Sequence, residues 1–143
     1  MTNGDIYDRD YRARRIAELR ANAAAKARPQ SATGDPSTWT WREAENAVAD
    51  WLRLHNEQQI VVGRGTHDGG VDVETSRWVV QVKHWGGRVG AEAVRQIFGV
   101  ATARGKAAMV VTLNGFTVDA LAFAEQAGVA LYVYRDGQFV AFS

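Results

Sequence analysis

The sequence predicts an α/β domain in which a mixed β-sheet is flanked by helices. Apolar residues recur at helical spacing in three stretches, and short apolar runs bounded by Gly, Asn or Asp lie between them. The predicted order is helix, three strands, helix, strand, helix, strand, strand. This order gives a meander on one side of the sheet and crossover helices on the other.

The first half of the domain is predicted from helix and turn signals. An amphipathic helix is expected over 40–55, with Thr40 and Glu43 as a capping box. A short strand over 59–62 and a glycine-rich turn over 63–70 follow. They lead into a hairpin of two strands, 71–75 and 78–83.

The second half continues with alternating helices and buried strands. A helix is predicted over 91–103, and Gly105 ends it. The run 107–113 is apolar on both faces, which is typical of a buried strand. Thr117 or Asn114 caps the next helix, and Gly128 closes it. Strands over 129–134 and 138–142 then form a final hairpin.

Composition limits the class of protein. The chain has 143 residues, no cysteine and a formal net charge of +1. This length suits one ordinary domain, and the lack of cysteine excludes disulfides, cysteine zinc sites and a thiol nucleophile. Because no apolar run is long enough for a membrane span or a signal peptide, we expect a cytoplasmic protein without membrane contact.

The N-terminal segment differs from the rest of the chain. Between Arg9 and Arg28, seven Lys and Arg residues stand against two acidic residues. The stretch favours helix, Pro29 ends it, and QSATGDPST has the composition of a linker. We therefore expect a basic helical tail and linker over 1–37 and a compact domain over 38–143. The tail is a candidate for DNA contact or for oligomerisation.

The hairpin from Gly69 to Lys83 holds the residues best suited to chemistry. Val80 and Val82 are expected to point one way, and Gln81 and Lys83 the other. Asp72 is expected to face away from the core together with Glu74, so that the polar side chains of the two arms converge.

This cluster suits metal-assisted cleavage of a phosphodiester. Mg²⁺ prefers hard oxygen ligands, which the Asp72 carboxylate, the Gln81 amide oxygen and the Val82 carbonyl supply. Such a metal polarises the phosphate and lowers the pKa of its bound water. Lys83 would orient the nucleophile or offset charge in the transition state. Taken singly, each of these residues also fits an ordinary solvated strand face.

Glu45 is a further candidate in the first helix. Its neighbours Ala44 and Val48 belong to the apolar face, so Glu45 lies at the border of that face. It either reaches the hairpin as an outer metal ligand or faces solvent.

The hairpin motif resembles a known family. DGGVDV followed by QVK, in the run from His67 to Lys83, resembles the Mrr-like branch of the PD-(D/E)xK restriction-endonuclease superfamily. QVKHWGGRVGAEAVRQIFGVA and MVVTLNGFTVDALAFAEQAGVALY extend the resemblance over about residues 40–137. It implies a restriction-endonuclease-like fold and an endonuclease that uses Mg²⁺, for which Mn²⁺ substitutes, on double-stranded DNA.

The resemblance also implies roles for single residues. Asp72 matches the metal-binding aspartate, and Gln81 matches a position that is acidic in most of the superfamily but glutamine in this branch. Lys83 matches the catalytic lysine, and Glu45 matches a first-helix glutamate that completes the site. Gln96 matches a glutamine near the active site. Glu74 stands where an apolar residue is more usual, and it either supplements Gln81 in metal binding or faces solvent.

Several residues are candidates for contacting DNA. Arg64, Arg77, Arg88 and Arg95 lie in or near loops around the hairpin, and His84 follows Lys83 directly. They are candidate phosphate contacts, although each arginine alone also fits a solubility charge.

The partners of the chain follow from its size. A separate DNA-reading domain has no room here, so we expect weak sequence specificity, or specificity supplied by dimerisation or by a partner chain. A homodimer would explain cleavage of both strands, since one site cuts one strand. The alternatives are a structure-specific nuclease such as a Holliday junction resolvase, and a non-catalytic DNA-binding module that retains the fold.

Overall fold

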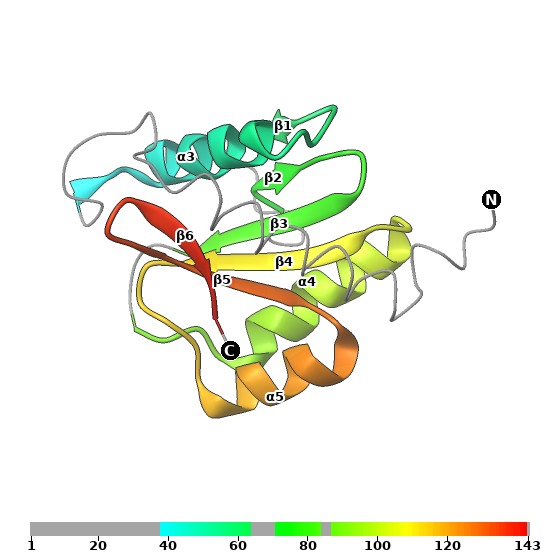
Figure 1. Ribbon diagram of the computed structural model, residues 1–143. Helices are drawn as coiled ribbons and strands as arrows, with labels where there is room; N and C mark the ends of the chain where they lie inside the picture. Colours follow the sequence, from blue (N-terminus) through cyan, green and yellow to red (C-terminus); the bar gives the residue numbers. More distant parts are fainter. Residues whose placement is uncertain (1–37, 64–70, 84–86, 143) are drawn as a thin grey trace.

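The computed structural model describes residues 38–63, 71–83 and 87–142. Its elements in chain order are α3 (Trp41–Leu54), β1 (Val61–Val62), β2 (Val73–Glu74), β3 (Trp78–Lys83), α4 (Ala91–Ala103), β4 (Ala107–Thr112), α5 (Val118–Ala127), β5 (Ala130–Arg135) and β6 (Gln138–Ala141). The order of elements is the predicted one (Figure 1).

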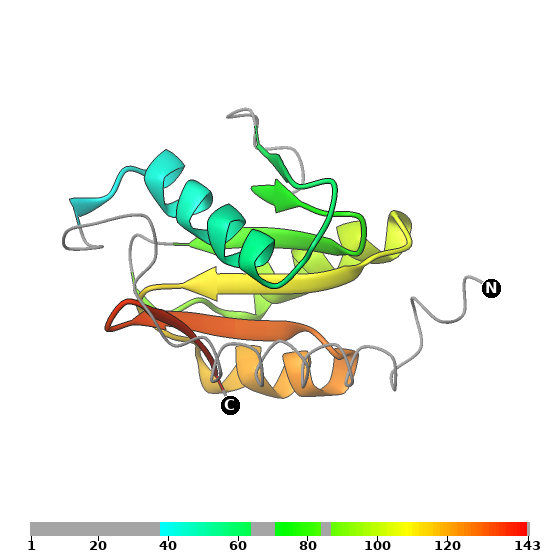
Figure 2. The ribbon, with the colours of Figure 1, turned by 45° about the horizontal axis from the view of Figure 1, so that its top comes forward.

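The strands form one mixed sheet in the order β1-β2-β3-β4-β5-β6. The pairs β1–β2, β2–β3 and β5–β6 are antiparallel, whereas β3, β4 and β5 are parallel neighbours. The predicted mixed sheet is therefore confirmed. In Figure 2, β3, β4 and β5 run side by side in the same direction, so their carboxyl ends lie on one side of the molecule.

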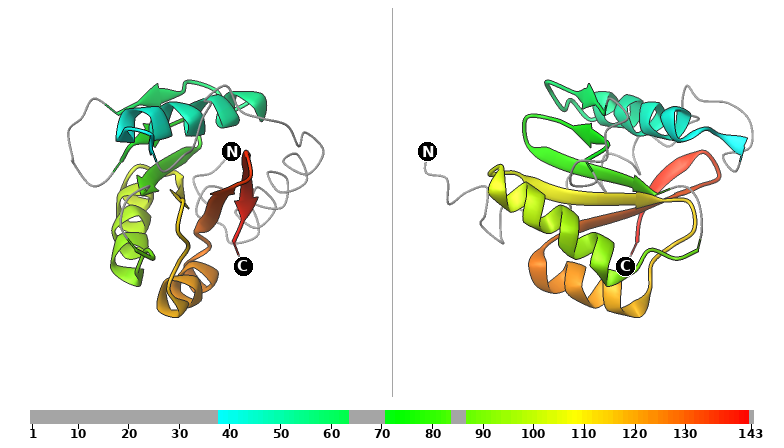
Figure 3. Two further views of the ribbon diagram at one scale, coloured as in Figure 1. Left: turned by 90° about the vertical axis from the view of Figure 1, so that its left-hand side faces the viewer. Right: turned by 180° about the vertical axis from the view of Figure 1, so that it is seen from behind.

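Helix α3 covers one face of the sheet, and α4 and α5 cover the other (Figure 3). The sheet thus separates two hydrophobic clusters. The cluster on the α3 face includes Val48, Trp51, Leu52, Val80, Met109 and Tyr132. The cluster on the opposite face, under α4 and α5, includes Val79, Val94, Ile97, Val110, Ala120 and Val133. Consecutive strand residues alternate between the two clusters, as the two-residue period of a β-strand requires.

The N-terminus of α3 is fixed as its sequence predicts. The Thr40 side chain accepts from the Glu43 N–H, and the Glu43 side chain accepts from the Thr40 N–H, which completes the capping box. Trp51 then packs against Tyr132 and Phe139, with ring centroids 4.8 and 5.0 Å apart. These contacts hold the helix against β5 and β6.

Two strands are shorter than predicted. The first expected strand, 59–62, contracts to β1 because Gln59 has a φ of 56°, which lies outside the extended range. The expected strand 71–75 contracts to β2 because Asp72 falls out of register with β3, as described below. The strands 78–83 and 107–113, by contrast, match β3 and β4 within one residue.

The last helix takes one of its two expected caps. The Thr117 side chain accepts from the Ala120 N–H, so Thr117 and not Asn114 is the N-cap of α5. Gly128 closes the helix in the left-handed conformation, with φ of 78°. None of the described helices has the length and apolar character needed to cross a membrane.

The predicted basic tail over 1–37 lies outside the described residues, as does most of the predicted glycine-rich turn.

Candidate active site

The two polar residues of β3, Gln81 and Lys83, lie at the carboxyl end of the strand. Val80 lies in the α3 cluster and Val82 packs against it, whereas Val79 lies in the opposite cluster. The prediction that Gln81 and Lys83 point away from Val80 and Val82 is therefore confirmed. Gln81 is buried, with 3% of its surface exposed, and Lys83 is exposed.

Asp72 lies at a bulge opposite β3. The sheet register pairs Val73 with Val80, yet the Asp72 N–H also donates to the Val80 carbonyl at 2.9 Å. Two consecutive residues thus stand opposite one. As a result Val71 packs against the α4–α5 cluster while Val73 lies in the α3 cluster, although a regular strand would place both on one face.

The bulge turns the Asp72 carboxylate toward the backbone of β3. Its Oδ2 accepts a hydrogen bond from the Val82 N–H at 2.8 Å. Asp72 therefore lies at the peptide that joins Gln81 to Val82. The contact with Val82 runs through this N–H, and ligation of a metal by the Val82 carbonyl stays a prediction.

Glu45 reaches Asp72 from α3. Its side chain is buried, with 3% exposed, and forms a hydrogen bond with the Asp72 side chain. Burial, followed by the Asp72 charge and this hydrogen bond, raises the pKa of Glu45 to about 8, while the Arg42 charge opposes the rise. Of the two orientations considered for Glu45, the structure has the one that faces the hairpin.

Glu45 and Gln81 each have a buried oxygen atom that lacks a donor. Glu45 Oε1 and Gln81 Oε1 are both buried without a hydrogen-bond partner. A buried acceptor without a donor is costly, and a bound cation is one way to satisfy it. Like the Asp72 carboxylate, these atoms are hard oxygen donors of the kind that Mg²⁺ or Mn²⁺ takes.

The carboxylates in this set number two. Within the described ranges, no three His, Cys, Asp or Glu side chains converge on one point. Mg²⁺ sites commonly use one or two carboxylates and complete their coordination with water and substrate phosphate. The residues present therefore fit a divalent cation of this type.

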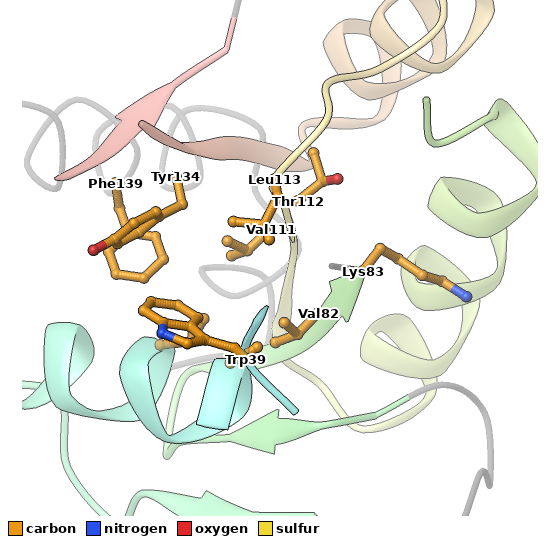
Figure 4. A pocket seen from close by; sticks show the side chains of 10 residues that line it. Trp39, Val82, Lys83, Val111, Thr112, Leu113, Tyr134 and Phe139 are labelled. Atoms are coloured by element: carbon orange, nitrogen blue, oxygen red, sulfur yellow. The ribbon is translucent and has the colours of Figure 1, made fainter. Parts of the chain in front are cut away.

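Lys83 stands beside the end of β4, where it pairs in register with Thr112. Figure 4 shows its side chain extending away from the rings of Trp39, Tyr134 and Phe139. Lys83 also takes part in lining a small hollow between α3 and the sheet. The other lining residues are Trp39, Ala44, Val48, Val82, Val111, Thr112, Leu113, Tyr134 and Phe139.

Glu74 is engaged elsewhere. One carboxylate oxygen pairs with Arg104 and the other with Lys106 at 2.7 Å, and Lys106 also donates to the Thr75 carbonyl. The expectation that Glu74 and Asp72 share a face is wrong, because the bulge lies between them. Neither suggested role for Glu74, metal ligand or solvated residue, matches these ion pairs.

The candidate DNA contacts fall in different places. Arg88 is exposed in the segment that follows the Lys83 edge. Arg77 is exposed at the opposite end of β3, about 20 Å from Lys83 along an extended strand. Arg77 therefore lies away from the Lys83 end of the strand. Arg95 and Gln96 are exposed on α4, where Arg95 lies over the Phe123 ring, 5.8 Å from its centroid. Arg64 and His84 lie outside the described residues.

Sequence reasoning missed Arg42 as a residue of the site. It is exposed in the first turn of α3, and its charge acts on Glu45. Its spacing supplied a signal, because residues three apart on a helix are neighbours on its surface.

Comparison with known proteins points to one family. A family model described as restriction endonuclease, the Mrr catalytic domain, matches residues 36–137. The match includes every described candidate site residue. Searches of curated proteins and of solved structures give no significant match.

Proposed function

The chain belongs to the Mrr-type restriction endonuclease family, and on that basis we propose that it is a metal-dependent endonuclease that hydrolyses phosphodiester bonds in double-stranded DNA. The observation that carries the proposal is the contact of the buried Glu45 with the half-buried Asp72, whose carboxylate accepts a hydrogen bond from the backbone of the strand bearing Gln81 and Lys83. The two buried oxygens without donors support a cation at this point.

Glu45, Asp72 and Gln81 would hold a Mg²⁺ or Mn²⁺ ion. When bound, this ion supplies a Lewis acid for the phosphate and a water of lowered pKa. Glu45 would give up its proton when the ion binds, since ligating carboxylates must be ionised.

Lys83 would place a positive charge beside the reacting phosphate. It is exposed at the strand end next to Gln81, and a cation there offsets the negative charge that develops on the phosphate oxygens. The bulge holds Asp72 in place through the Val82 N–H, so the carboxylate keeps its orientation before substrate arrives.

Plasmid cleavage tests the proposal. We expect purified protein to nick or linearise supercoiled plasmid with Mg²⁺ and to stop when EDTA is added. Lys83→Ala should lower the rate by at least about 100-fold. Lys106→Ala is the matched control, because this lysine forms an ion pair with Glu74 at the opposite end of the strands from Lys83. Equal cleavage by wild type and Lys83→Ala would refute the assignment.

The products also test the expected homodimer. A single site cuts one strand, so a monomer should accumulate nicked circles, whereas a dimer should yield linear DNA directly. Parallel assays on a four-way junction and on a linear duplex separate a structure-specific nuclease from a restriction-type enzyme. Sedimentation at the assay concentration gives the oligomeric state independently.

A further inference from the structure

Two segments that follow the carboxyl ends of β3 and β4 are joined by backbone hydrogen bonds. The Val89 N–H donates to the Gly115 carbonyl at 2.9 Å, and the Thr117 N–H donates to the Val89 carbonyl at 2.9 Å. Together they form an isolated parallel bridge between Val89 and Phe116. We refer to this pair of bonds as the Val89 clamp. It ties the segment after β3 to the turn after β4.

The turn side of the clamp is rigidly held. Gly115 has a φ of 113°, which is readily accessible only to glycine. Phe116 is buried, and its ring centroid lies 5.2 Å from that of Phe142. Thr117 is the N-cap of α5. The backbone angle, the ring contact and the helix cap together fix this turn. Val89, which is itself buried and bonded to the turn, therefore has a defined position.

The clamp places Arg88 at a defined distance from the site. Lys83 is in register with Thr112, and Val89 is bridged to Phe116. Phe116 follows Thr112 by four positions, so the two residues are at most about 14 Å apart. Because the nucleotides of one DNA strand rise 3.4 Å each, this upper limit corresponds to about four nucleotides.

Arg88 is also the one basic residue of the described segments that the clamp joins. The segments 87–90 and 113–119 contain no other Lys or Arg, and their single acidic residue is the exposed Asp119 in the first turn of α5. Arg95 lies over the Phe123 ring, and Arg77 lies at the opposite end of β3. Among the described residues of these two segments, Arg88 is therefore the one that can supply a positive charge to a DNA phosphate.

We propose that the Val89 clamp positions Arg88 to bind a DNA phosphate a few nucleotides from the bond that is cut. The proposal rests on the nuclease function above and adds a substrate-binding residue and the element that orients it. A loop fixed before binding loses less entropy when the contact forms, so the clamp makes the contact tighter. In this arrangement Arg88 touches substrate, and Gly115 is a positioning residue.

Equilibrium binding at several salt concentrations tests the role of Arg88. A labelled duplex is titrated by anisotropy in Ca²⁺, with a gel to verify that the DNA stays intact. Loss of one phosphate contact should lower the slope of log affinity against log salt by about 1. We expect this of Arg88→Ala, with a loss of affinity of roughly fivefold to tenfold, and much less of Arg88→Lys. Arg77→Ala is the matched control and should leave the slope unchanged.

A double-mutant cycle tests the clamp. Gly115→Ala should weaken binding when Arg88 is present and add no loss in the Arg88→Ala background, because it acts through that residue. The added Cβ meets nothing closer than Phe142 Cε1 at 3.9 Å, so the strain comes from the backbone angle. Gly105→Ala is the control, because Gly105 also has a positive φ, of 69°, and lies at the opposite end of β4. Circular dichroism and Tm establish folding, and the Arg88 arm decides alone if Gly115→Ala does not fold.

The outcomes separate the two proposals. If the wild type cuts DNA but Arg88→Ala keeps the full salt slope, or if Arg77→Ala lowers it equally, the Arg88 assignment is wrong and the nuclease function stands. If Gly115→Ala weakens binding equally in both backgrounds, the clamp does not act through Arg88. A wild type that neither binds nor cuts DNA overturns both proposals.

Discussion

The Oδ2 atom of Asp72 accepts a hydrogen bond from the N–H of Val82 at 2.8 Å. This bond links a carboxylate to the backbone between the two polar side chains of β3, so Asp72, Gln81 and Lys83 keep a common frame. Hydrogen bonds from N–H groups to a carboxylate are stronger than those between neutral groups. Glu45 completes the arrangement by contacting the same carboxylate from α3.

Replacing Asp72 by Asn should separate cleavage from folding. The Asn Oδ1 can still accept from the Val82 N–H, so Tm should change little. The amide lacks the charge that binds a divalent cation, and cleavage should fall by at least about 100-fold. Plasmid assays and thermal melts measure the two effects. Asp50→Asn, on the exposed Asp50–Arg53 pair of α3, is the control and should retain activity.

Metal-free protein should lose stability as the pH rises. The Glu45 pKa is about 8 in the folded state against 4.5 for the free group, so the folded state binds the proton more tightly. Its contribution is full below about pH 4.5 and is lost as the pH rises through about 8.

Urea unfolding in EDTA measures this loss. Between about pH 5.5 and 8.5 the free energy of unfolding should fall by more than about 1 kcal/mol, since one pKa unit corresponds to about 1.4 kcal/mol. Glu45→Gln should flatten the dependence, whereas Glu125→Gln, at an exposed position on α5, should not. An unchanged slope in Glu45→Gln would contradict the assignment of the proton to this residue.

Neutralising Glu74 should affect stability without affecting catalysis. Glu74→Gln removes the charge that Arg104 and Lys106 share. Because these groups are partly exposed, the free energy of unfolding should fall by about 1 kcal/mol or less. Cleavage with Mg²⁺ should stay within about twofold of the wild type. A much larger loss of activity at unchanged stability would indicate that Glu74 acts in the metal site.

The capping box of α3 should be measurable in thermal melts. Thr40→Ala removes the side-chain acceptor for the Glu43 N–H and should cost about 1 kcal/mol. Thr40→Ser keeps a hydroxyl and should recover most of that loss. If Ala and Ser melt together, the cap contributes little to the native state.

The predictable part of the fold depends on local pattern. The helix over 91–103 and the strand over 78–83 are recovered with their bounds because apolar spacing and Gly105 act within a few residues. The left-handed Gly128 and the Thr117 cap are likewise local signals. Candidate site residues on these elements could be placed on the correct face.

The rest depends on partners far away in sequence. The bulge at Asp72 arises from its pairing with Val80, and strand alternation alone therefore put Asp72 on the face of Glu74. Glu74 takes partners 30 and 32 residues later. Arg77 is near the hairpin in sequence, yet it precedes a strand whose other end carries Lys83.

The contact between Asp72 and Val82 spans ten residues, and the whole β2–β3 turn lies inside that interval. The number of residues between the two positions therefore decides which peptide lies opposite Asp72. Insertion or deletion of one residue in the turn would bring Asp72 opposite a different peptide and would reverse the face of every following side chain. Exchanges at the exposed Ser76 or Arg77 keep the length unchanged. A search for related sequences, or the transfer of this site to another scaffold, should therefore hold the length of the interval fixed and let the composition of the turn vary.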